Sequence, residues 1–171
     1  IDLTDYRAFR EVGLRGLTVE GTERPGARDR NGARNALFAD LLVTTGLRLE
    51  EASHLLAAEI PVCDARSECQ RRVELPAALT KGDRGRSMLL PRRLLPVFDA
   101  YIAVERAAAV AKFAQRRGWE AIDRPIFIHS PSFGQRALPL VGGGAMDMDV
   151  VTPDERARLV ICADDGTPRE A

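Results

Sequence analysis

Apolar residues recur at three- and four-residue steps in several segments of the chain, which is the pattern of helices with one buried face. The predicted helices span residues 3–12, 33–45, 47–57 and 91–117. Gly46 should end the second of them, and Pro91 is a residue that commonly opens a helix. The pattern therefore predicts a mainly helical structure up to about residue 124.

A shorter period appears in the middle of the chain. Residues 71–75 alternate between polar and apolar side chains, and residues 87–90 form a second strand candidate. The segment between them contains Thr80-Lys81-Gly82-Asp83-Arg84-Gly85, whose two glycines beside charged residues are typical of a hairpin tip. From residue 125 onward, extended pieces are expected at 126–128, 137–141, 146–151 and 159–162.

These elements predict an α+β fold with a small antiparallel hairpin. Residues 1–124 would contain the helices and the hairpin, and residues 125–171 would be an extended, β-rich insertion. A chain of 171 residues is long enough for one globular domain and too short for two ordinary ones.

The net charge is zero, with 25 basic and 25 acidic residues, but the charge is unevenly distributed. Residues 66–93 contain eight basic and three acidic residues, whereas residues 125–171 contain seven acidic residues and four arginines. The attraction of a phosphate backbone depends more on the local distribution of charge than on the net charge of the chain. The basic middle therefore keeps double-stranded DNA as a candidate partner.

Other classes of protein fit the sequence poorly. No apolar run approaches the roughly 18 residues of a membrane helix, and residues 1–10 carry four charges where a signal peptide would be apolar. Cys63, Cys69 and Cys162 are an odd number at spacings that match no zinc pattern. We expect a reduced cytoplasmic protein without a metal, a cofactor or a membrane partner.

Two motifs resemble the tyrosine recombinase (phage integrase) family. In Thr45-Gly46-Leu47-Arg48, a helix ends at Thr-Gly and an arginine begins the next helix, with an acid, Glu51, three residues later. This resembles the family's first active-site motif, and the segment 80–86 before Leu89-Leu90-Pro91 resembles its lysine-bearing hairpin. The resemblance covers roughly residues 3–104, and within the family the chain is similar to actinobacterial integrases. The joint occurrence of both motifs in the same order is what makes it specific.

The resemblance implies a role for each motif residue. Arg48 would donate hydrogen bonds to the phosphate oxygens that gain charge during DNA cleavage, and its place at a helix start suits an anion. Lys81, by resemblance, is the general acid for the leaving 5′-oxygen. It is one of only two lysines, with Lys112, in a chain that otherwise uses arginine. Glu51 would support the site, although an exposed helix acid is an equal alternative.

Four arginines would supply phosphate contacts that position a duplex: Arg84, Arg86, Arg92 and Arg93. His54 lies where the family pattern has no catalytic histidine, so we interpret it as structural. We expect Arg48 and Lys81 to face one basic surface, with the Lys81 turn more mobile than the helices.

Several family elements are missing from the sequence. There is no His-x-x-Arg segment, and neither Tyr6 nor Tyr101 matches the position of the family's nucleophile. We therefore expect an inactive fragment of a bacterial, DNA-associated recombinase. Its parent would act without cofactors, through a 3′-phosphotyrosine intermediate and in a tetrameric synapse on DNA. The alternative is a noncatalytic DNA-binding or protein-interaction module on the same scaffold.

Overall fold

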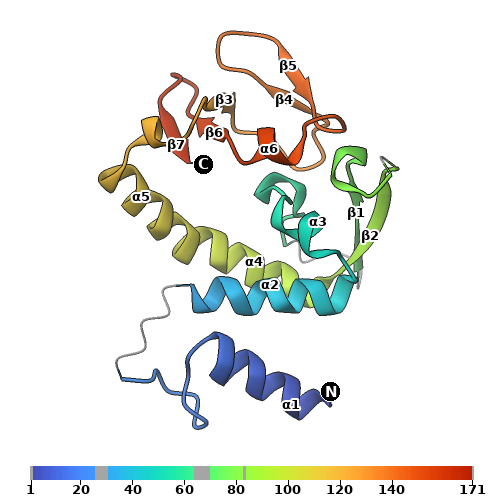
Figure 1. Ribbon diagram of the computed structural model, residues 1–171, viewed down its shortest axis with the longest axis vertical. Helices are drawn as coiled ribbons and strands as arrows, with labels where there is room; N and C mark the ends of the chain where they lie inside the picture. Colours follow the sequence, from blue (N-terminus) through green and yellow to red (C-terminus); the bar gives the residue numbers. More distant parts are fainter. Residues whose placement is uncertain (1, 26–30, 64–69, 83, 171) are drawn as a thin grey trace.

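The computed structural model describes residues 2–25, 31–63, 70–82 and 84–170 and has an α+β fold. Figure 1 shows two parts. The helical lobe contains helices α1 to α5 and the hairpin β1–β2, and the C-terminal lobe contains residues 126–170 with five short strands and one helix. Cys69 and Asp83 lie outside the described residues. None of the helices within the described ranges is long and apolar enough to cross a membrane.

The helices of the first lobe are α1 (Leu3–Ala8), α2 (Gly32–Thr45), α3 (Leu49–Ser53), α4 (Leu95–Tyr101) and α5 (Ala107–Arg116). The turns of Ile102–Arg106 join α4 and α5 into one long helical stretch (Figure 1). The prediction for 33–45 is therefore confirmed, and that for 91–117 is confirmed from residue 92 onward, because Pro91 is the last residue of the preceding strand. The prediction for 47–57 is wrong in length. The carbonyl oxygen of Glu50 accepts hydrogen bonds from the Ser53 hydroxyl and interacts with the His54 ring, so α3 ends early.

The predicted hairpin is present. Strand β1 (Gln70–Leu75) pairs antiparallel with β2 (Arg86–Pro91), and the connection of residues 76–85 contains a short helical turn at Ala77–Leu79. One face of the pair carries Val73, Leu75, Met88 and Leu90, all buried. This face packs in one apolar cluster with Leu41 and Leu47 from the α2–α3 region, and with Leu94 and Leu95 at the start of α4.

The C-terminal lobe has its own apolar cluster, formed by Ile128, Leu138, Met148, Val151 and Leu159. Its strands are β3 (Ile126–His129), β4 (Ala137–Pro139), β5 (Ala145–Asp147), β6 (Leu159–Cys162) and β7 (Pro168–Glu170), with α6 at Pro153–Arg156. Strand β6 lies between β3, to which it is parallel, and β7, to which it is antiparallel.

The sequence predicted β3, β4, β5 and β6 approximately but missed β7, α6 and the parallel pairing. Helix α6 has four residues, too few to show a helical period, and is held by its first turn. There the Thr152 hydroxyl accepts the backbone N–H of Glu155, and the Glu155 carboxylate accepts the backbone N–H of Thr152.

Arg156 joins the two lobes. Its Nη1 donates to Oε2 of Glu59 at 2.9 Å and to the carbonyl oxygen of His54 at 3.3 Å, both in the helical lobe. Its Nε and Nη2 donate to the carbonyl oxygens of Val151 and Met148 within its own lobe. The arginine side chain is 1% exposed and that of Glu59 is 7% exposed. The guanidinium is thus enclosed by acceptors from both lobes.

Candidate functional site

The end of α2 determines where Arg48 lies. The Thr45 hydroxyl donates to the carbonyl oxygen of Leu41 at 2.6 Å and accepts the backbone N–H of Leu47 at 3.3 Å. Gly46 follows with a φ of 66°, in the left-handed region that favours glycine, and its N–H donates to the Leu42 carbonyl. The Thr-Gly pair therefore ends the helix and turns the chain so that Arg48 begins α3.

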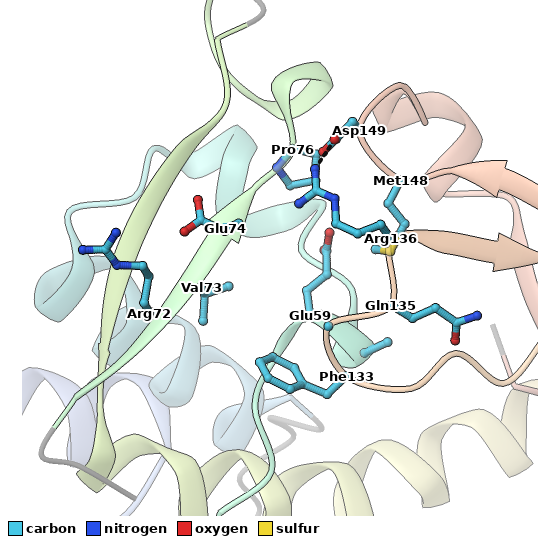
Figure 2. A pocket seen from close by; sticks show the side chains of 12 residues that line it. Glu59, Arg72, Val73, Glu74, Pro76, Phe133, Gln135, Arg136, Met148 and Asp149 are labelled. Atoms are coloured by element: carbon cyan, nitrogen blue, oxygen red, sulfur yellow. Dashed lines mark hydrogen bonds and ion pairs between the residues drawn. The ribbon is translucent and has the colours of Figure 1, made fainter.

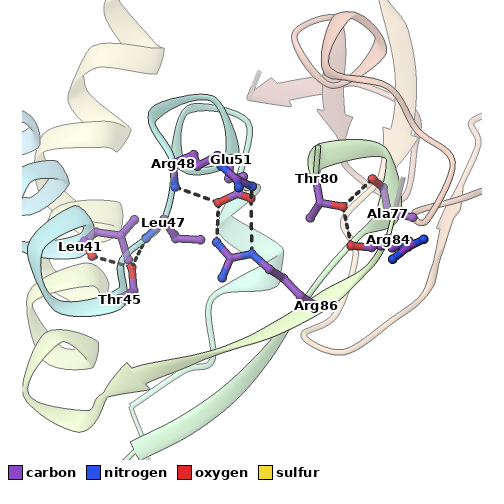
Figure 3. Close-up of polar contacts among 9 residues, drawn as sticks. All are labelled: Leu41, Thr45, Leu47, Arg48, Glu51, Ala77, Thr80, Arg84 and Arg86. Atoms are coloured by element: carbon purple, nitrogen blue, oxygen red, sulfur yellow. Dashed lines mark hydrogen bonds and ion pairs between the residues drawn. The ribbon is translucent and has the colours of Figure 1, made fainter. Parts of the chain in front are cut away.

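Arg48 is bound twice by the carboxylate of Glu51. Its backbone N–H donates to Oε2 at 2.8 Å and its Nη1 donates to Oε1 at 3.2 Å (Figure 3). The Glu51 side chain is 1% exposed, whereas that of Arg48 is 61% exposed. The interpretation of Glu51 as an exposed helix acid is therefore wrong. The buried carboxylate fixes the base of an arginine whose guanidinium still faces solvent.

A second arginine reaches the same carboxylate from the hairpin. Arg86 opens β2, and its Nη2 donates to Oε2 of Glu51 at 2.6 Å while its Nε lies 3.4 Å from Oε1. Figure 3 shows Arg48 and Arg86 on two sides of the carboxylate. The sequence predicted a phosphate contact for Arg86 and did not predict this carboxylate partner. The available signal was its distance of two residues from buried Met88, which places it on the core-facing side of the strand.

The two arginines lower the pKa of the Glu51 carboxyl. Its burial would raise the pKa of the carboxyl, but hydrogen bonds from Arg86 and from the Arg48 backbone, together with both positive charges, lower the pKa below its usual value. Glu51 is therefore ionised at neutral pH. One carboxylate and two guanidinium groups give the cluster of Arg48, Glu51 and Arg86 a net charge of +1, and the exposed Glu50 in the first turn of α3 adds a negative charge beside it.

Thr80 braces the turn that carries Lys81. Its hydroxyl lies 3.0 Å from the Ala77 carbonyl oxygen and 2.6 Å from that of Arg84, and the threonine is buried. Gly82, with a φ of 85°, allows the turn after the lysine. Lys81 itself is exposed. Thr80 is hydrogen-bonded to Arg84 (Figure 3), two residues before the Arg86 that opens β2, so the Lys81 turn adjoins along the chain the strand start that reaches Glu51.

The four predicted phosphate contacts are not one group. Arg84 lies in the connection beside the Lys81 turn, and Arg86 opens β2. Arg92 and Arg93 follow the far end of β2, roughly 16 Å away at about 3.3 Å per strand residue. Arg93 lines a groove between α1 and α2. The structure therefore brings together Arg48, Glu51 and Arg86, and it separates Arg92 and Arg93 from them.

A cavity of about 200 Å³ lies between β1 and the C-terminal lobe (Figure 2). Its lining includes Arg72 and Glu74 from the strand and Phe133, Arg136 and Asp149 from the other lobe. Arg136 and Asp149 form an ion pair with each other. The sequence analysis singled out none of these residues, because the cavity exists only where the two lobes meet.

Comparison of the chain with protein-family models, with curated proteins and with solved structures finds no match.

Proposed function

We propose that this chain contributes the phosphate-binding arginine and the proton-donating lysine of a DNA breaking and rejoining enzyme of the tyrosine recombinase type. The observation that supports the proposal most is the placement of Arg48. Its position is held by a buried carboxylate, yet its side chain is mainly exposed at the start of α3, and the same carboxylate binds the first residue of the strand that follows the Lys81 turn.

The chemistry assigns one step to each residue. A deprotonated tyrosine oxygen attacks phosphorus and forms the phosphotyrosine bond, the bond from phosphorus to the 5′-oxygen breaks, and the Lys81 ammonium gives that oxygen a proton. Arg48 donates hydrogen bonds to the non-bridging oxygens, on which negative charge increases in the transition state. A preorganised donor of this kind contributes roughly 2.7–4 kcal/mol to the transition state, or 100- to 1000-fold in rate.

The nucleophile of that step has no match among the 171 residues. The Tyr6 hydroxyl donates to Oδ1 of Asp40 at 2.8 Å. Burial, this hydrogen bond and the negative charge of Asp40 raise the pKa of Tyr6 to about 12, which makes it a poor nucleophile. Tyr101 is the last residue of α4. On this proposal the chain binds DNA but forms no covalent adduct by itself.

The first test measures DNA binding by the chain as a function of salt concentration. We expect weak, largely sequence-independent binding that falls steeply with salt. Arg48→Ala should weaken binding about tenfold and reduce the slope of log affinity against log salt by about one. The matched control is Arg116→Ala, which removes an exposed arginine from α5. Equal effects of the two variants would contradict the proposal.

The second test separates the enzyme from the noncatalytic module. It uses a full-length protein that contains these residues and a nicked DNA substrate on which covalent trapping is timed. Lys81→Ala should slow trapping, and replacing the 5′-oxygen by sulfur, which needs little protonation, should restore the rate. Arg48→Ala should show no such rescue, and Lys112→Ala should behave as the unaltered protein does. Binding without any adduct would favour the noncatalytic module.

A further inference from the structure

Arg86 differs from the other hairpin arginines because its side chain contacts a buried carboxylate of the helical lobe. It lies on the face of β2 that also carries Met88 and Leu90, and its guanidinium meets a carboxylate that is 1% exposed. The Arg86 side chain is 38% exposed, against 61% for Arg48. The more enclosed of the two arginines is therefore the one that comes from the hairpin.

Glu51 links two elements that carry the proposed site residues. One of its oxygens, Oε2, accepts both the Arg48 backbone N–H at 2.8 Å and Arg86 Nη2 at 2.6 Å. The other, Oε1, accepts Arg48 Nη1 at 3.2 Å and lies 3.4 Å from Arg86 Nε. The two arginines thus share both oxygens. A displacement of Arg86 changes the carboxylate that holds Arg48.

The same arginine begins the strand that leaves the Lys81 turn. Thr80, directly before Lys81, bonds to the carbonyl oxygen of Arg84, two residues before Arg86. The turn is therefore tied to the strand start, and the strand start is tied through Glu51 to the start of α3. This sequence of contacts connects Lys81 to Arg48 within the protein.

From these contacts we propose that Arg86 is a positioning residue. It acts through Glu51 to orient the Arg48 guanidinium, and it does not itself contact phosphate. The proposal rests on the proposed function in one respect: the group that Arg86 orients is the one that meets DNA.

Conservative replacement distinguishes positioning from phosphate contact. Arg86→Lys keeps the charge but loses the guanidinium fork that meets both oxygens of Glu51. A lysine keeps the positive charge on which sequence-independent phosphate binding depends, so a contact role predicts affinity within about twofold of the original chain. A positioning role predicts a loss of about tenfold, similar to that of Arg48→Ala. Arg84→Lys is the matched control and should change affinity little, because the Arg84 side chain makes no fork with a carboxylate of the described residues.

A double-mutant cycle gives the second measurement. If Arg86 acts through Arg48, Arg86→Lys should have less than a twofold effect in chains that already carry Arg48→Ala. Independent, multiplying effects would overturn the proposal. Thermal unfolding of each variant, in the absence of DNA, shows whether it is folded at the temperature of the binding assay.

A DNA-free measurement keeps this inference distinct from the proposed function. The Nε–H signal of Arg48 in heteronuclear NMR reports how ordered its side chain is on the picosecond to nanosecond timescale. Arg86→Lys should make Arg48 more mobile, whereas Arg84→Lys should not. An Arg48 signal unchanged by Arg86→Lys would overturn the positioning role even if DNA binds. Increased mobility together with DNA binding indifferent to Arg48→Ala would refute the proposed function and leave the orientation of Arg48 by Arg86 established.

Discussion

Two buried glutamates have the same local construction in different parts of the molecule. Glu51 and Glu59 each accept, at 2.8 Å, the backbone N–H of the residue three positions earlier, at the start of a short helical segment. Each also binds an arginine from a distant part of the sequence. Arg86 reaches Glu51 across 35 residues, and Arg156 reaches Glu59 across 97 residues.

The two clusters differ in what surrounds the arginines. Arg156 is 1% exposed and donates to three carbonyl oxygens as well as to its carboxylate. At Glu51 the arginines are 38% and 61% exposed. A guanidinium whose donors meet acceptors within the fold serves to join elements, whereas one anchored on a single side can still bind an external anion. The comparison thus separates a structural ion pair from a candidate binding site.

The largest effect should come from the enclosed cluster. Arg156→Met removes the charge that compensates buried Glu59 and leaves three carbonyl oxygens without this donor. Breaking a buried pair by removing one partner costs about 3–5 kcal/mol in the free energy of unfolding. Urea denaturation followed by circular dichroism measures this change.

The paired replacement Arg156→Met with Glu59→Leu is the control for that experiment. It removes both charges and should recover part of the lost stability, because no uncompensated buried charge remains. A single variant as stable as the original chain would show that the two lobes do not depend on this contact.

A smaller effect is expected at the open cluster. Glu51→Gln replaces the charged acceptor with a neutral amide and removes charge-assisted hydrogen bonds, which contribute about 1.5–3 kcal/mol. The cost stays below that of Arg156→Met because water can hydrate the two exposed arginines that are left. Thermal or urea unfolding of the two variants under identical conditions tests the order. A larger loss of unfolding free energy for Glu51→Gln than for Arg156→Met would contradict the expected order.

The sequence predicted the open cluster better than the enclosed one for a physical reason. Arg48 and Glu51 are three residues apart, and a helix start brings such neighbours together whatever the rest of the fold does. Arg156 and Glu59 meet only because the C-terminal lobe folds back onto the helical lobe. No local spacing encodes that contact. Arg86 lies between these cases, since alternation in the strand indicates its face but not the carboxylate opposite.

For the secondary structure too, elements fixed by local sequence patterns were predicted better than those that depend on distant partners. Helix α2 and the β1–β2 pair have clear periods and were predicted nearly to their ends. The C-terminal lobe consists of strands of three or four residues, too short for a period to identify their partners. The parallel pairing of β3 with β6 joins segments about 30 residues apart, which no turn signal could reveal.

The stability that Glu51 contributes should depend on pH. The pKa of this carboxyl is lowered in the folded chain from the ordinary value of 4.5, so the unfolded chain binds its proton more readily. The ionised carboxylate therefore contributes its full stabilisation above about pH 4.5, and this contribution is lost as pH falls through the lowered pKa. Other carboxyls titrate in the same range, so the useful quantity is the difference in unfolding free energy between the original chain and Glu51→Gln. That difference should shrink as pH falls from 6 toward 3. A difference that stays constant with pH would show that the charge of Glu51 does not contribute to the free energy of unfolding.

The smallest effect on stability should come from Arg48→Ala, although Arg48 is the residue to which we assign the largest role in binding DNA. Its side chain is 61% exposed, and exposed ion pairs contribute about 0–1 kcal/mol. The stronger contact with Glu51 is made by the Arg48 backbone N–H, which alanine retains, and Arg86 still compensates the buried charge. The free energy of unfolding should therefore fall by less than about 1 kcal/mol. Urea denaturation at neutral pH measures it, and a loss as large as that of Glu51→Gln would mean that the guanidinium is part of the structural contact. A stable Arg48→Ala chain with weakened DNA binding would instead separate the two uses of the cluster: the carboxylate and Arg86 hold the fold, and the exposed guanidinium is left for the ligand.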